Sequence, residues 1–280
     1  MKAMRIFNVL WIVMFLFAAC TPAAAPTSAP TAAPTSAPTA AQTSKLPDLG
    51  GKEVKVAVEN AYPPFNFIDK KTNQGAGWDF DAWTEICKLI NCKPVMTEAA
   101  WEGIFEAAAA GQYDVVADGV TINDERKKTV AFSDPYLKYG QVILVRADET
   151  RFTDAKSLAA LTEAFASAQL GTTNEAKAIE IVGEARVKSF DTFDGSVLAL
   201  MSKDVDAVIM DQPAALGYMA ANKGKLKIVG ELLTSEALGF VFKQGSDLIA
   251  PVNAALAELK ANGTLDKLYQ RWFVDWVPVP

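Results

Sequence analysis

The sequence predicts an α/β fold with mainly parallel sheets, and three observations lead to this prediction. Short runs with the apolar pattern of strands begin at 54–58 and recur along the chain. Segments with apolar residues at helical spacing separate most of these runs, beginning with 79–90. A second series of the same kind starts at 164. Strands separated by helices favour parallel sheets, in which ligands bind at the carboxyl ends of the strands.

The first series of elements extends from residue 54 to residue 146. An apolar residue recurs every three or four positions in 79–90, which predicts a helix with one buried face. Asn123 is a suitable N-cap for a helix that opens with 124–126. The other elements expected here are strands at 54–58, 94–97, 114–117 and 141–146, and a helix at 104–110.

The second series begins with a strand expected within 164–170, followed by the turn Gly171-Thr172-Thr173. Gly263 lies between the last two predicted helices, at the C′ position just after a helix end, where glycine is common. The predicted helices are 174–182, 196–201, 213–221, 247–261 and 265–272. The predicted strands are 187–190, 206–210, 226–229 and 239–242.

Residues 1–20 are interpreted as a secretory signal. Lys2 and Arg5 precede an apolar run that is too short for a membrane span, which needs about 20 residues. The run ends in two alanines before Cys20, and this ending resembles the bacterial lipobox, with Phe17 at the usual leucine position. We therefore expect acyl chains on Cys20 that anchor the protein to the lipid bilayer. An ordinary signal peptide cleaved nearby is the alternative.

Residues 21–44 consist almost entirely of Ala, Pro, Thr and Ser, and one eight-residue block occurs twice, at 25–32 and 33–40. The segment has no large apolar side chains with which to form a core. We expect an extended spacer that rises about 3.1 Å per residue where it adopts polyproline II. Such a spacer would let a soluble body reach a partner in the membrane.

The body that begins at residue 45 is acidic and lacks histidine. The formal charge of the chain is −6, and it becomes −8 once Lys2 and Arg5 are removed with the signal. An acidic body argues against nucleic-acid binding. The absence of histidine excludes Ser-His-Asp and Cys-His catalysis and every zinc site that needs imidazole. We therefore expect no cofactor, no metal and no catalytic residue, and no second apolar run is long enough for a membrane span.

The chain has three cysteines: Cys20, Cys87 and Cys92. Once Cys20 carries lipid, the other two remain, five residues apart in an exported protein. A disulfide that closes the end of the predicted helix 79–90 is one interpretation, and two buried free thiols are the other.

Several runs resemble the family 3 solute-binding proteins, which include binding proteins for glutamine, for histidine and for lysine, arginine and ornithine. Each run alone is a weak signal, but they occur in the family's order across residues 53–273. In the first half these runs are Tyr62-Pro63-Pro64-Phe65, Gly77-Trp78-Asp79-Phe80-Asp81, Trp101-Glu102-Gly103-Ile104, Tyr113-Asp114-Val115-Val116, Thr121-Ile122-Asn123-Asp124-Glu125-Arg126-Lys127-Lys128 and Phe132-Ser133-Asp134-Pro135-Tyr136. In the second half they are Gly171-Thr172-Thr173, Val205-Asp206-Ala207-Val208-Ile209-Met210-Asp211 and the run from Asn262-Gly263-Thr264 through Trp272-Phe273.

The resemblance implies a type II periplasmic-binding-protein fold, with two α/β lobes joined by two crossover segments. The ligand would bind between the lobes, which would close on it by hinge bending. The expected boundaries are 46–136 plus 239–280 for lobe one, 141–233 for lobe two, and 137–140 and 234–238 for the crossovers. The chain departs from the family at 158–168, where a Gly-Lys turn is usual.

The resemblance also implies a function: a monomeric, extracytoplasmic protein that delivers a free amino acid to an ABC permease. Arg126 would hold the ligand carboxylate with its planar fork of donors, at the first turn of a helix. Thr121 and Thr173 would add donors from the two lobes. Asp211 would pair with the ligand ammonium, and Gly119 would offer its carbonyl.

Two of these residues also have purely structural interpretations. Arg126 could form a surface ion pair with Asp124 or Glu125. Asp211 could cap a helix that begins near Pro213. The family pattern around both residues favours the ligand roles.

The side-chain end of the site would determine specificity. Tyr62 and Trp101 match the aromatic pair that encloses the ligand side chain, and core packing is the alternative. Glu59 matches the position that contacts the far end of the ligand, and Gln169 stands where the glutamine-binding protein has lysine. Asp118 could face the ligand or point into its lobe. Two acids and two aromatic rings predict arginine, lysine or ornithine as ligand, with glutamine next.

Two other functions are compatible with this fold. Cyclohexadienyl dehydratases share it, and Glu59, Asp118 or Asp211 could then act as a general acid. A sensory module that reports ligand to a membrane receptor is the second alternative. Receptor-fused relatives usually continue into a membrane span, whereas this sequence ends at Pro280.

Overall fold

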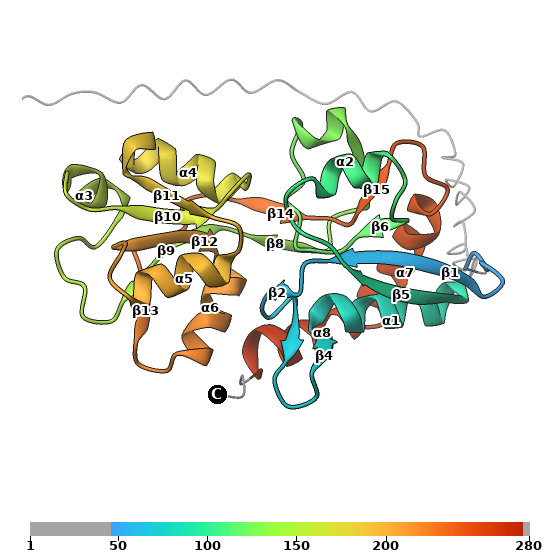
Figure 1. Ribbon diagram of the computed structural model, residues 1–280. Coiled ribbons are helices and arrows are strands. Elements are labelled where there is room, and N and C mark those ends of the chain that lie inside the picture. The colour runs from blue at the N-terminus through green and yellow to red at the C-terminus, as the bar shows by residue number, and fades with distance from the viewer. Residues whose placement is uncertain (1–45, 277–280) are drawn as a thin grey trace, which may run out of the picture. The chain divides into compact units, whose positions relative to one another are not determined.

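The computed structural model describes residues 46–276 of this 280-residue chain (Figure 1). These residues fold around two five-stranded sheets. The predicted signal 1–20, with the lipid attachment at Cys20, and the predicted spacer 21–44 lie outside the described residues. Within the described part of the chain, no helix has the length and apolarity that crossing a membrane requires.

The first sheet carries the amino-terminal half of the fold and one late strand. Its strands in spatial order are β5 (Cys92–Glu98), β1 (Lys52–Val58), β6 (Val115–Val116), β15 (Val241–Lys243) and β7 (Val130–Phe132). β1 pairs in parallel with β5 and β6, whereas β15 runs antiparallel to β6 and β7. Helices α1 (Trp78–Ile90) and α2 (Ile104–Ala109) lie on opposite sides of this sheet (Figure 1).

The second sheet carries the middle of the chain. Its strands in spatial order are β11 (Val187–Phe190), β10 (Ala166–Gln169), β12 (Ala207–Asp211), β9 (Gln141–Arg146) and β13 (Leu226–Val229). β10 pairs in parallel with β11 and β12, and β9 runs antiparallel to β12 and β13. Helix α4 (Thr173–Val182) lies on one side of this sheet, and α5 (Phe193–Met201) and α6 (Gln212–Ala221) lie on the other (Figure 1).

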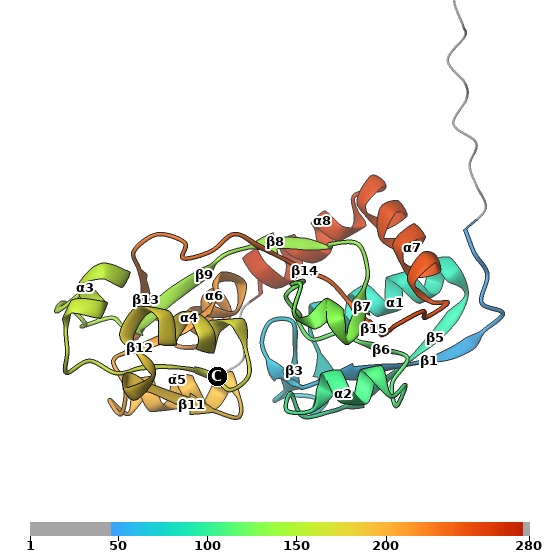
Figure 2. The same ribbon diagram turned by 90° about the horizontal axis from the view of Figure 1, so that it is seen from above.

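Two short strands, β8 (Leu137–Tyr139) and β14 (Glu236–Leu238), run between the sheets and pair with each other in antiparallel register (Figures 1 and 2). β8 leads directly into β9, and β14 leads directly into β15. Because no helix returns the chain in either case, β9 and β15 enter their sheets antiparallel to their neighbours. The α/β class predicted from the sequence is confirmed, with mixed sheets. We call the residues on either side of β8 and β14 lobe one and lobe two, with the predicted boundaries, and that division stays a prediction.

The packing of α1 shows how the helical pattern of the sequence forms a core. Its apolar stripe is completely buried at Trp83, Ile86 and Ile90. The ring of Trp83 lies 5.2 Å from the ring of Phe240, which leads into β15. Each such buried side chain contributes roughly 1.5–3 kcal/mol of transfer free energy. Helix α7 (Ile249–Ala261) covers α1 and is followed by α8 (Thr264–Tyr269) and a π-helical turn, η3 (Gln270–Val274).

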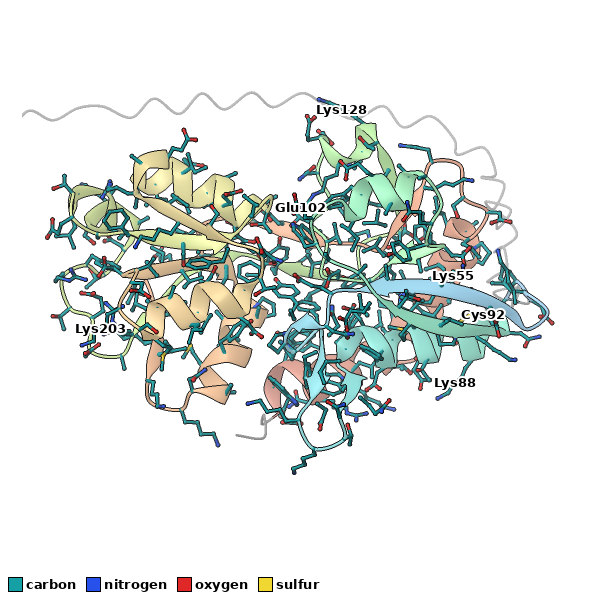
Figure 3. The ribbon with its side chains drawn as sticks, in the orientation of Figure 1. Lys55, Lys88, Cys92, Glu102, Lys128 and Lys203 are labelled. Atoms are coloured by element: carbon teal, nitrogen blue, oxygen red, sulfur yellow. A yellow bond between two sulfur atoms is a disulfide. The ribbon has the colours of Figure 1, made fainter. Side chains whose placement is uncertain are left out.

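Cys87 and Cys92 form a disulfide, with Cα atoms 4.5 Å apart. Helix α1 ends at Asn91, which adopts a left-handed conformation with φ of 51°, and β5 begins at the next residue. The bond therefore links the last turn of α1 to the start of β5, near the labelled Cys92 in Figure 3. This decides between the two interpretations of the cysteines in favour of the disulfide.

The helix predicted after Asn123 is a single 3-10 turn, η1 (Arg126–Lys128). The N-cap of this turn is Glu125 rather than Asn123, although Asn123 Oδ1 accepts a hydrogen bond from the backbone N–H of Arg126 at 2.8 Å. Strand β7 begins at Val130, which leaves no room for a longer helix. The prediction that Arg126 lies at the start of an α-helix is therefore wrong.

Several short elements lack the periodic pattern on which the sequence prediction depends. They are the three-stranded meander of β2 (Ala61–Tyr62), β3 (Asn66–Asp69) and β4 (Gln74–Ala76), and helix α3 (Ala155–Ala160). α3 has a recognisable start, because Asp154 Oδ1 accepts from the backbone N–H of Ser157 at 2.7 Å. The Ser157 hydroxyl accepts in return from the N–H of Asp154, which completes a capping box. α3 occupies part of the segment where the chain departs from the family pattern.

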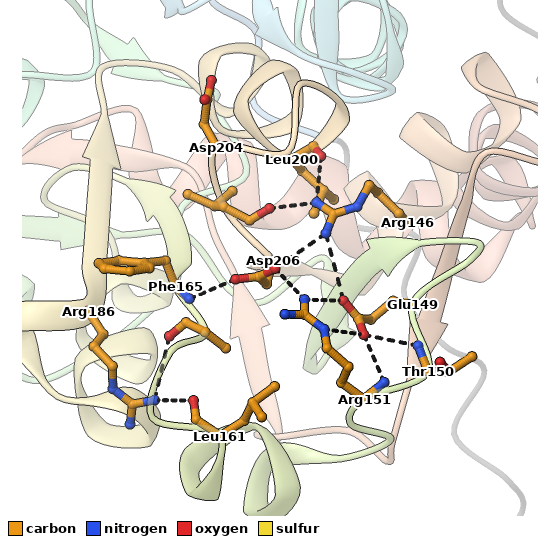
Figure 4. A network of polar contacts seen from close by, with 12 residues as sticks. Arg146, Glu149, Thr150, Arg151, Leu161, Phe165, Arg186, Leu200, Asp204 and Asp206 are labelled. Carbon is orange, nitrogen blue, oxygen red and sulfur yellow. Dashed lines mark hydrogen bonds and ion pairs between the residues drawn. The ribbon is translucent and has the colours of Figure 1, made fainter.

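A partly exposed ionic network ties together the ends of the second sheet that lie away from lobe one (Figure 4). Arg146, at the end of β9, donates to the carbonyls of Leu200 and Val205 at 2.8 and 2.6 Å. Glu149 accepts from Arg151 at 3.0 and 2.6 Å, and these hydrogen bonds lower the pKa of Glu149 to about 2. The network thus links β9 and β12 at the ends opposite to those that face lobe one.

Candidate functional site

A cavity of about 20 Å³ lies where the two lobes meet. All ten residues predicted to bind ligand line it, together with three that the sequence did not single out. They are Glu59, Tyr62, Trp101, Asp118, Gly119, Thr121, Arg126, Gln169, Thr173 and Asp211, joined by Thr172, Asn174 and Phe193. A cavity of this volume holds about one water molecule, whereas small-molecule pockets usually measure about 300 Å³ or more. An amino acid can therefore bind here only if the lobes or the lining side chains move apart.

The strand order explains why residues so far apart in the sequence meet here. Glu59 follows β1 and Asp118 follows β6, and these strands are parallel neighbours. Gln169 and Asp211 are the last residues of β10 and β12, which are parallel neighbours in the other sheet. The carboxyl ends of both parallel pairs therefore face the junction between the lobes, the position where α/β sheets bind ligands.

Asp211 is almost completely buried and is held from both sides. Its carboxylate accepts a hydrogen bond from the hydroxyl of Tyr62, in lobe one. Its other oxygen accepts from Asn174 Nδ2 of lobe two at 2.8 Å. Burial raises the pKa of Asp211 to about 6, although both hydrogen bonds act to lower it. Its side chain makes no cap contact with α6, which begins at the next residue, so the alternative role as a helix cap is wrong.

Arg126 packs its guanidinium against two aromatic rings of lobe one. The guanidinium carbon lies 5.3 Å from the centre of the Trp101 ring and 4.7 Å from that of Phe105. Its Nη1 donates to the carbonyl of Thr121 at 3.0 Å, which fixes the side chain beside the cavity. Burial lowers the pKa of Arg126.

The acidic neighbours of Arg126 are engaged with lysines. Asp124 pairs with Lys127 at 3.1 Å, and Glu125 pairs with Lys128 at 2.5 Å. The alternative interpretation of Arg126, a surface ion pair with one of these acids, is therefore not what the structure has.

The turn before α4 brings lobe two to the cavity. Gly171 has a φ of +71°, and the Thr172 hydroxyl oxygen caps α4 by accepting from the backbone N–H of Glu175 at 3.1 Å. Thr173 is the first residue of α4, one position earlier than predicted. A Cβ added to Gly171 would lie 3.7 Å from the indole nitrogen of Trp101, so the two lobes approach closely at this turn. Figure 3 labels Glu102, which follows Trp101 in the loop that faces lobe two.

Two carboxyl groups occupy the other end of the cavity. Asp118 Oδ1 accepts from Asn66 Nδ2 at 2.8 Å, and its Oδ2 is buried without a hydrogen-bond partner among the described residues. Glu59 Oε1 accepts from Gln169 Nε2 at 2.7 Å, a bond that joins the two lobes. Burial raises the pKa of both carboxyls, and the charge of Asp118 raises that of Glu59 further. Asp118 lines the cavity and also accepts hydrogen bonds from its own lobe, so its contact with a ligand stays a prediction.

The aromatic residues of the cavity make separate contacts. Tyr62 stacks on Phe65 and on Phe193, with ring centres 5.1 and 5.3 Å apart. Trp101 packs edge-on against Phe105, with centres 5.3 Å apart. The predicted enclosure of a ligand by Tyr62 and Trp101 stays a prediction, and Phe193 is an aromatic lining residue that no sequence pattern indicated.

Gly119 is required by the position of Tyr62. A Cβ at Gly119 would lie 2.6 Å from Cε1 of the Tyr62 ring, and the residue has a φ of +55°. Both facts exclude an ordinary side chain here without rearrangement. The close approach of the backbone to Tyr62 is therefore built into the cavity wall.

A larger groove of about 890 Å³ opens between the β2–β4 meander, η3 and helices α5 and α6. Two of its charged residues already have partners. Asp194 accepts from the hydroxyl of Tyr218 at 2.6 Å, and Arg271 pairs with Asp81 at 2.8 Å. Its lining offers no buried pair of opposite free charges, so we place the candidate site in the smaller cavity. Among the described residues no group of three or more potential ligands could hold a metal ion.

The fold and the cavity define a two-lobed binding protein with its site between the lobes. Comparison with known proteins gives the family: the chain belongs to the bacterial extracellular solute-binding proteins, family 3, whose sequence model matches residues 54–275. One relative is the L-cystine-binding protein TcyA of Bacillus subtilis, which is 31% identical over 220 residues, covering 78% of this chain and 80% of the relative.

Solved structures agree with this assignment. An ancestral arginine-binding protein bound to glutamine is 36% identical with a TM-score of 0.73, covering 79% of this chain and 97% of that protein. The arginine-, lysine-, histidine-binding protein ArtJ of Geobacillus stearothermophilus is 29% identical with a TM-score of 0.74, covering 81% and 97%. AncCDT-1, an ancestral amino acid-binding protein and precursor of cyclohexadienyl dehydratase, is 35% identical with a TM-score of 0.72, covering 79% and 95%. The predicted two-lobed binding-protein fold is thereby confirmed.

Proposed function

We propose that this chain is the extracytoplasmic substrate-binding protein of an amino-acid ABC importer and that it holds a free amino acid between its lobes. One observation carries the proposal: Arg126 and Asp211, of opposite charge, line the same buried cavity from different lobes. An amino acid carries one anionic and one cationic group, so it can neutralise both. The names of the relatives, all binding proteins for amino acids, support the same function.

In this proposal Arg126, Thr121 and Thr173 receive the ligand carboxylate. Asp211 and the carbonyl of Gly119 receive the ammonium. Because these residues come from both lobes, a ligand that contacts all of them binds the closed arrangement better than an open one. That difference in affinity is what drives lobe closure.

The acidic end of the cavity supports a cationic ligand side chain. Asp118 offers a buried carboxylate oxygen without a partner, and Glu59 lies beside it. A guanidinium or ammonium group would satisfy both carboxylates and pack against Tyr62 or Trp101. We therefore propose arginine, lysine or ornithine as the ligand, with glutamine as the next candidate.

We further propose that acyl chains on Cys20 anchor the mature protein and that residues 21–44 let its body reach the permease as a monomer. The family, which is described as extracellular, supports an extracytoplasmic location. Metabolic labelling with a fatty acid tests the anchor. Incorporation that disappears in Cys20→Ala is expected, and equal labelling of both proteins would contradict it.

The function is tested by thermal unfolding of the body, residues 45–280, which forms a compact unit of its own. The panel comprises the twenty amino acids with ornithine, citrulline and cystine. A ligand at 100 times its dissociation constant stabilises the folded state by about 2.7 kcal/mol. We expect the largest shift with arginine, lysine or ornithine, and its loss in Arg126→Ala and Asp211→Ala. A best response to glutamate or to a branched apolar amino acid would overturn the proposed ligand class. No response to any compound would overturn the function.

A dehydratase is the second candidate, and one observation favours testing it. Burial raises the pKa of Glu59, as a general acid at neutral pH requires. However, Glu59 is hydrogen-bonded to Gln169, and Arg126 and Asp211 keep the charges that amino-acid binding needs. We expect no loss of prephenate or arogenate on incubation with the protein. Turnover that depends on Glu59 would replace the binding function with an enzymatic one.

A further inference from the structure

Five polar side chains form a closed ring of hydrogen bonds beside the cavity. The ring, which we call the hinge ring, consists of Thr121, Tyr139, Glu236, Gln141 and Thr173. Tyr139 and Glu236 face each other on the paired strands β8 and β14, and Gln141 begins β9. Thr121 and Thr173 line the cavity from lobe one and lobe two. The hinge ring therefore connects both strands between the lobes with the two threonines proposed to receive the ligand carboxylate.

The positions of the hydrogens in half of this ring follow from Tyr139. Its hydroxyl donates to Glu236 Oε2 at 2.6 Å. A phenol has one hydrogen, so the second contact of the Tyr139 hydroxyl, 2.6 Å from Thr121 Oγ1, must be one in which Thr121 donates. The hydroxyl hydrogen of Thr121 is therefore directed at Tyr139 and away from the cavity.

The other half of the ring follows from Gln141. Its Nε2 donates to Thr173 Oγ1 at 3.0 Å and makes a longer contact of 3.4 Å with Glu236 Oε1. The opposite orientation of the amide would place its oxygen 3.4 Å from the carboxylate of Glu236, which is repulsive, although the orientation in the structure leaves the amide oxygen buried without a partner among the described residues. Thr173 Oγ1 thus accepts from Gln141, and its own hydrogen remains uncommitted, with only Thr121 Oγ1 at 3.4 Å as a weak partner.

We propose that Glu236 is a positioning residue for the ligand. By accepting from both Tyr139 and Gln141, it orients the hinge ring so that Thr173 donates its hydroxyl hydrogen to the ligand carboxylate. The hydroxyl hydrogen of Thr121 then takes no part, and Thr121 receives the carboxylate through its backbone N–H. Glu236 does not line the cavity, so it acts through the other members of the ring. This inference rests on the proposed function, because it concerns the group that an amino-acid carboxylate meets.

The substitution Glu236→Gln tests the proposal because it keeps the size of the side chain but replaces one acceptor with a donor. If the new amide nitrogen faces Gln141, the Gln141 amide must turn, and its oxygen then takes the hydrogen of Thr173. If the nitrogen faces Tyr139, the phenol must donate to Thr121, whose own hydrogen becomes available to the ligand. In either case Thr173 ceases to be the sole hydroxyl donor to the carboxylate.

The experiment is a double-mutant cycle on the full mature chain, with L-arginine and L-glutamine as probes and calorimetry as the measurement. Thr173→Val should raise the dissociation constant about tenfold or more in the wild-type background, because a hydrogen bond to a charged group is lost. In the Glu236→Gln background the same change should have a much smaller effect. Glu231→Gln is the matched control, since it removes the same charge from an exposed residue of the same segment.

Argininamide separates positioning from a general loss of structure, because it carries a neutral carboxamide in place of the carboxylate. Glu236→Gln should weaken arginine binding and change argininamide binding much less. If Glu236→Gln does not fold, Tyr139→Phe provides the same cycle, since it also frees the hydroxyl of Thr121. The inference would be overturned if the effects of the two substitutions on the dissociation constant simply multiplied, within about twofold, in the double variant. It would also be overturned if Glu236→Gln weakened the binding of arginine and of argininamide equally. A wild-type protein that binds neither amino acid would instead overturn the proposed function and the inference with it.

Discussion

The hydroxyl of Tyr62 donates a hydrogen bond to the carboxylate of Asp211, which lies 149 residues further along the chain. Tyr62 belongs to the meander of lobe one, and Asp211 ends a strand of lobe two. With Asn174 on its other oxygen, Asp211 is oriented by one donor from each lobe. A carboxylate that is already oriented needs little rearrangement to receive an ammonium group, which favours tight binding.

Replacing Asp211 with Asn should therefore weaken binding strongly while the fold is kept. The amide has nearly the same shape but no charge, so a buried ligand ammonium would lack its counter-ion. Loss of one partner of a buried charge pair costs about 2–5 kcal/mol, or about 30-fold or more in the dissociation constant. Calorimetry with arginine gives the change directly. Asp204→Asn is the control, because Asp204 is an exposed acid of the same lobe. Equal effects of the two substitutions would remove Asp211 from the site.

Replacing Arg126 with Lys should also weaken binding, although the charge is retained. The guanidinium can donate to a carboxylate with two parallel N–H groups while it packs on Trp101 and Phe105. Lysine offers a single charged nitrogen, and the loss of one charge-assisted hydrogen bond should cost about 1.5–3 kcal/mol of binding free energy. Arg271→Lys is the matched control, because Arg271 is largely exposed and also lies over a tryptophan. Binding unchanged in Arg126→Lys would mean that Arg126 does not hold the carboxylate through its fork.

The helices and strands could be predicted wherever apolar residues recur with the period of a helix or a strand. The helical spacing of 79–90 gave α1 to within one residue at its start, and the apolar run 141–146 coincides with β9. The strands β8 and β14 have three residues each, too few for a period, and their pairing depends on residues almost a hundred positions apart. α3 could have been found, because Asp154 and Ser157 have the spacing of a capping box.

The residues of the site could be predicted from family motifs, whereas the contacts between those residues could not. All ten predicted residues line one cavity: most of them lie at or near the carboxyl end of a strand or at the start of α4, and Arg126 reaches the cavity from η1. Phe193 and Asn174 follow turns in lobe two, and only the closeness of the lobes brings them to Tyr62 and Asp211. Glu236 has no sequence signal either, because its partners Tyr139 and Gln141 lie 97 and 95 residues earlier in the chain.

Gly119→Ala should destabilise the protein more than a positive φ alone explains. The left-handed conformation costs a non-glycine residue about 1–2 kcal/mol, and the contact of the new Cβ with the Tyr62 ring adds about 1–3 kcal/mol of overpacking. Gly111→Ala is the matched control. Its φ of +74° carries the same conformational cost, but the nearest atom to its added Cβ is the flexible Lys243 side chain at 3.6 Å. Urea unfolding measures the free energy of unfolding of both variants. Equal losses of stability would show that the Tyr62 ring moves aside at no cost in free energy.

Binding of a cationic amino acid should release a proton from the pair formed by Glu59 and Asp118. Burial raises the pKa of both groups, and further acids face them, Asp79 and Asp194. The free pair therefore retains a proton near neutral pH. A bound guanidinium favours the charged forms and lowers these pKa values, so binding expels the proton and the affinity for arginine rises with pH. The rise ends where the free pair has lost its protons.

Calorimetry in phosphate and in Tris measures this proton directly, because the two buffers absorb different heats when they take up a proton. At pH 7 we expect the binding of arginine to release about one proton, and the binding of neutral glutamine to release much less. Glu59→Gln removes one of the two coupled carboxyls and should reduce the release, whereas Glu53→Gln, an exposed acid in the same lobe, should not. Arginine binding with the same heat in both buffers would mean that binding releases no proton, which would contradict the prediction.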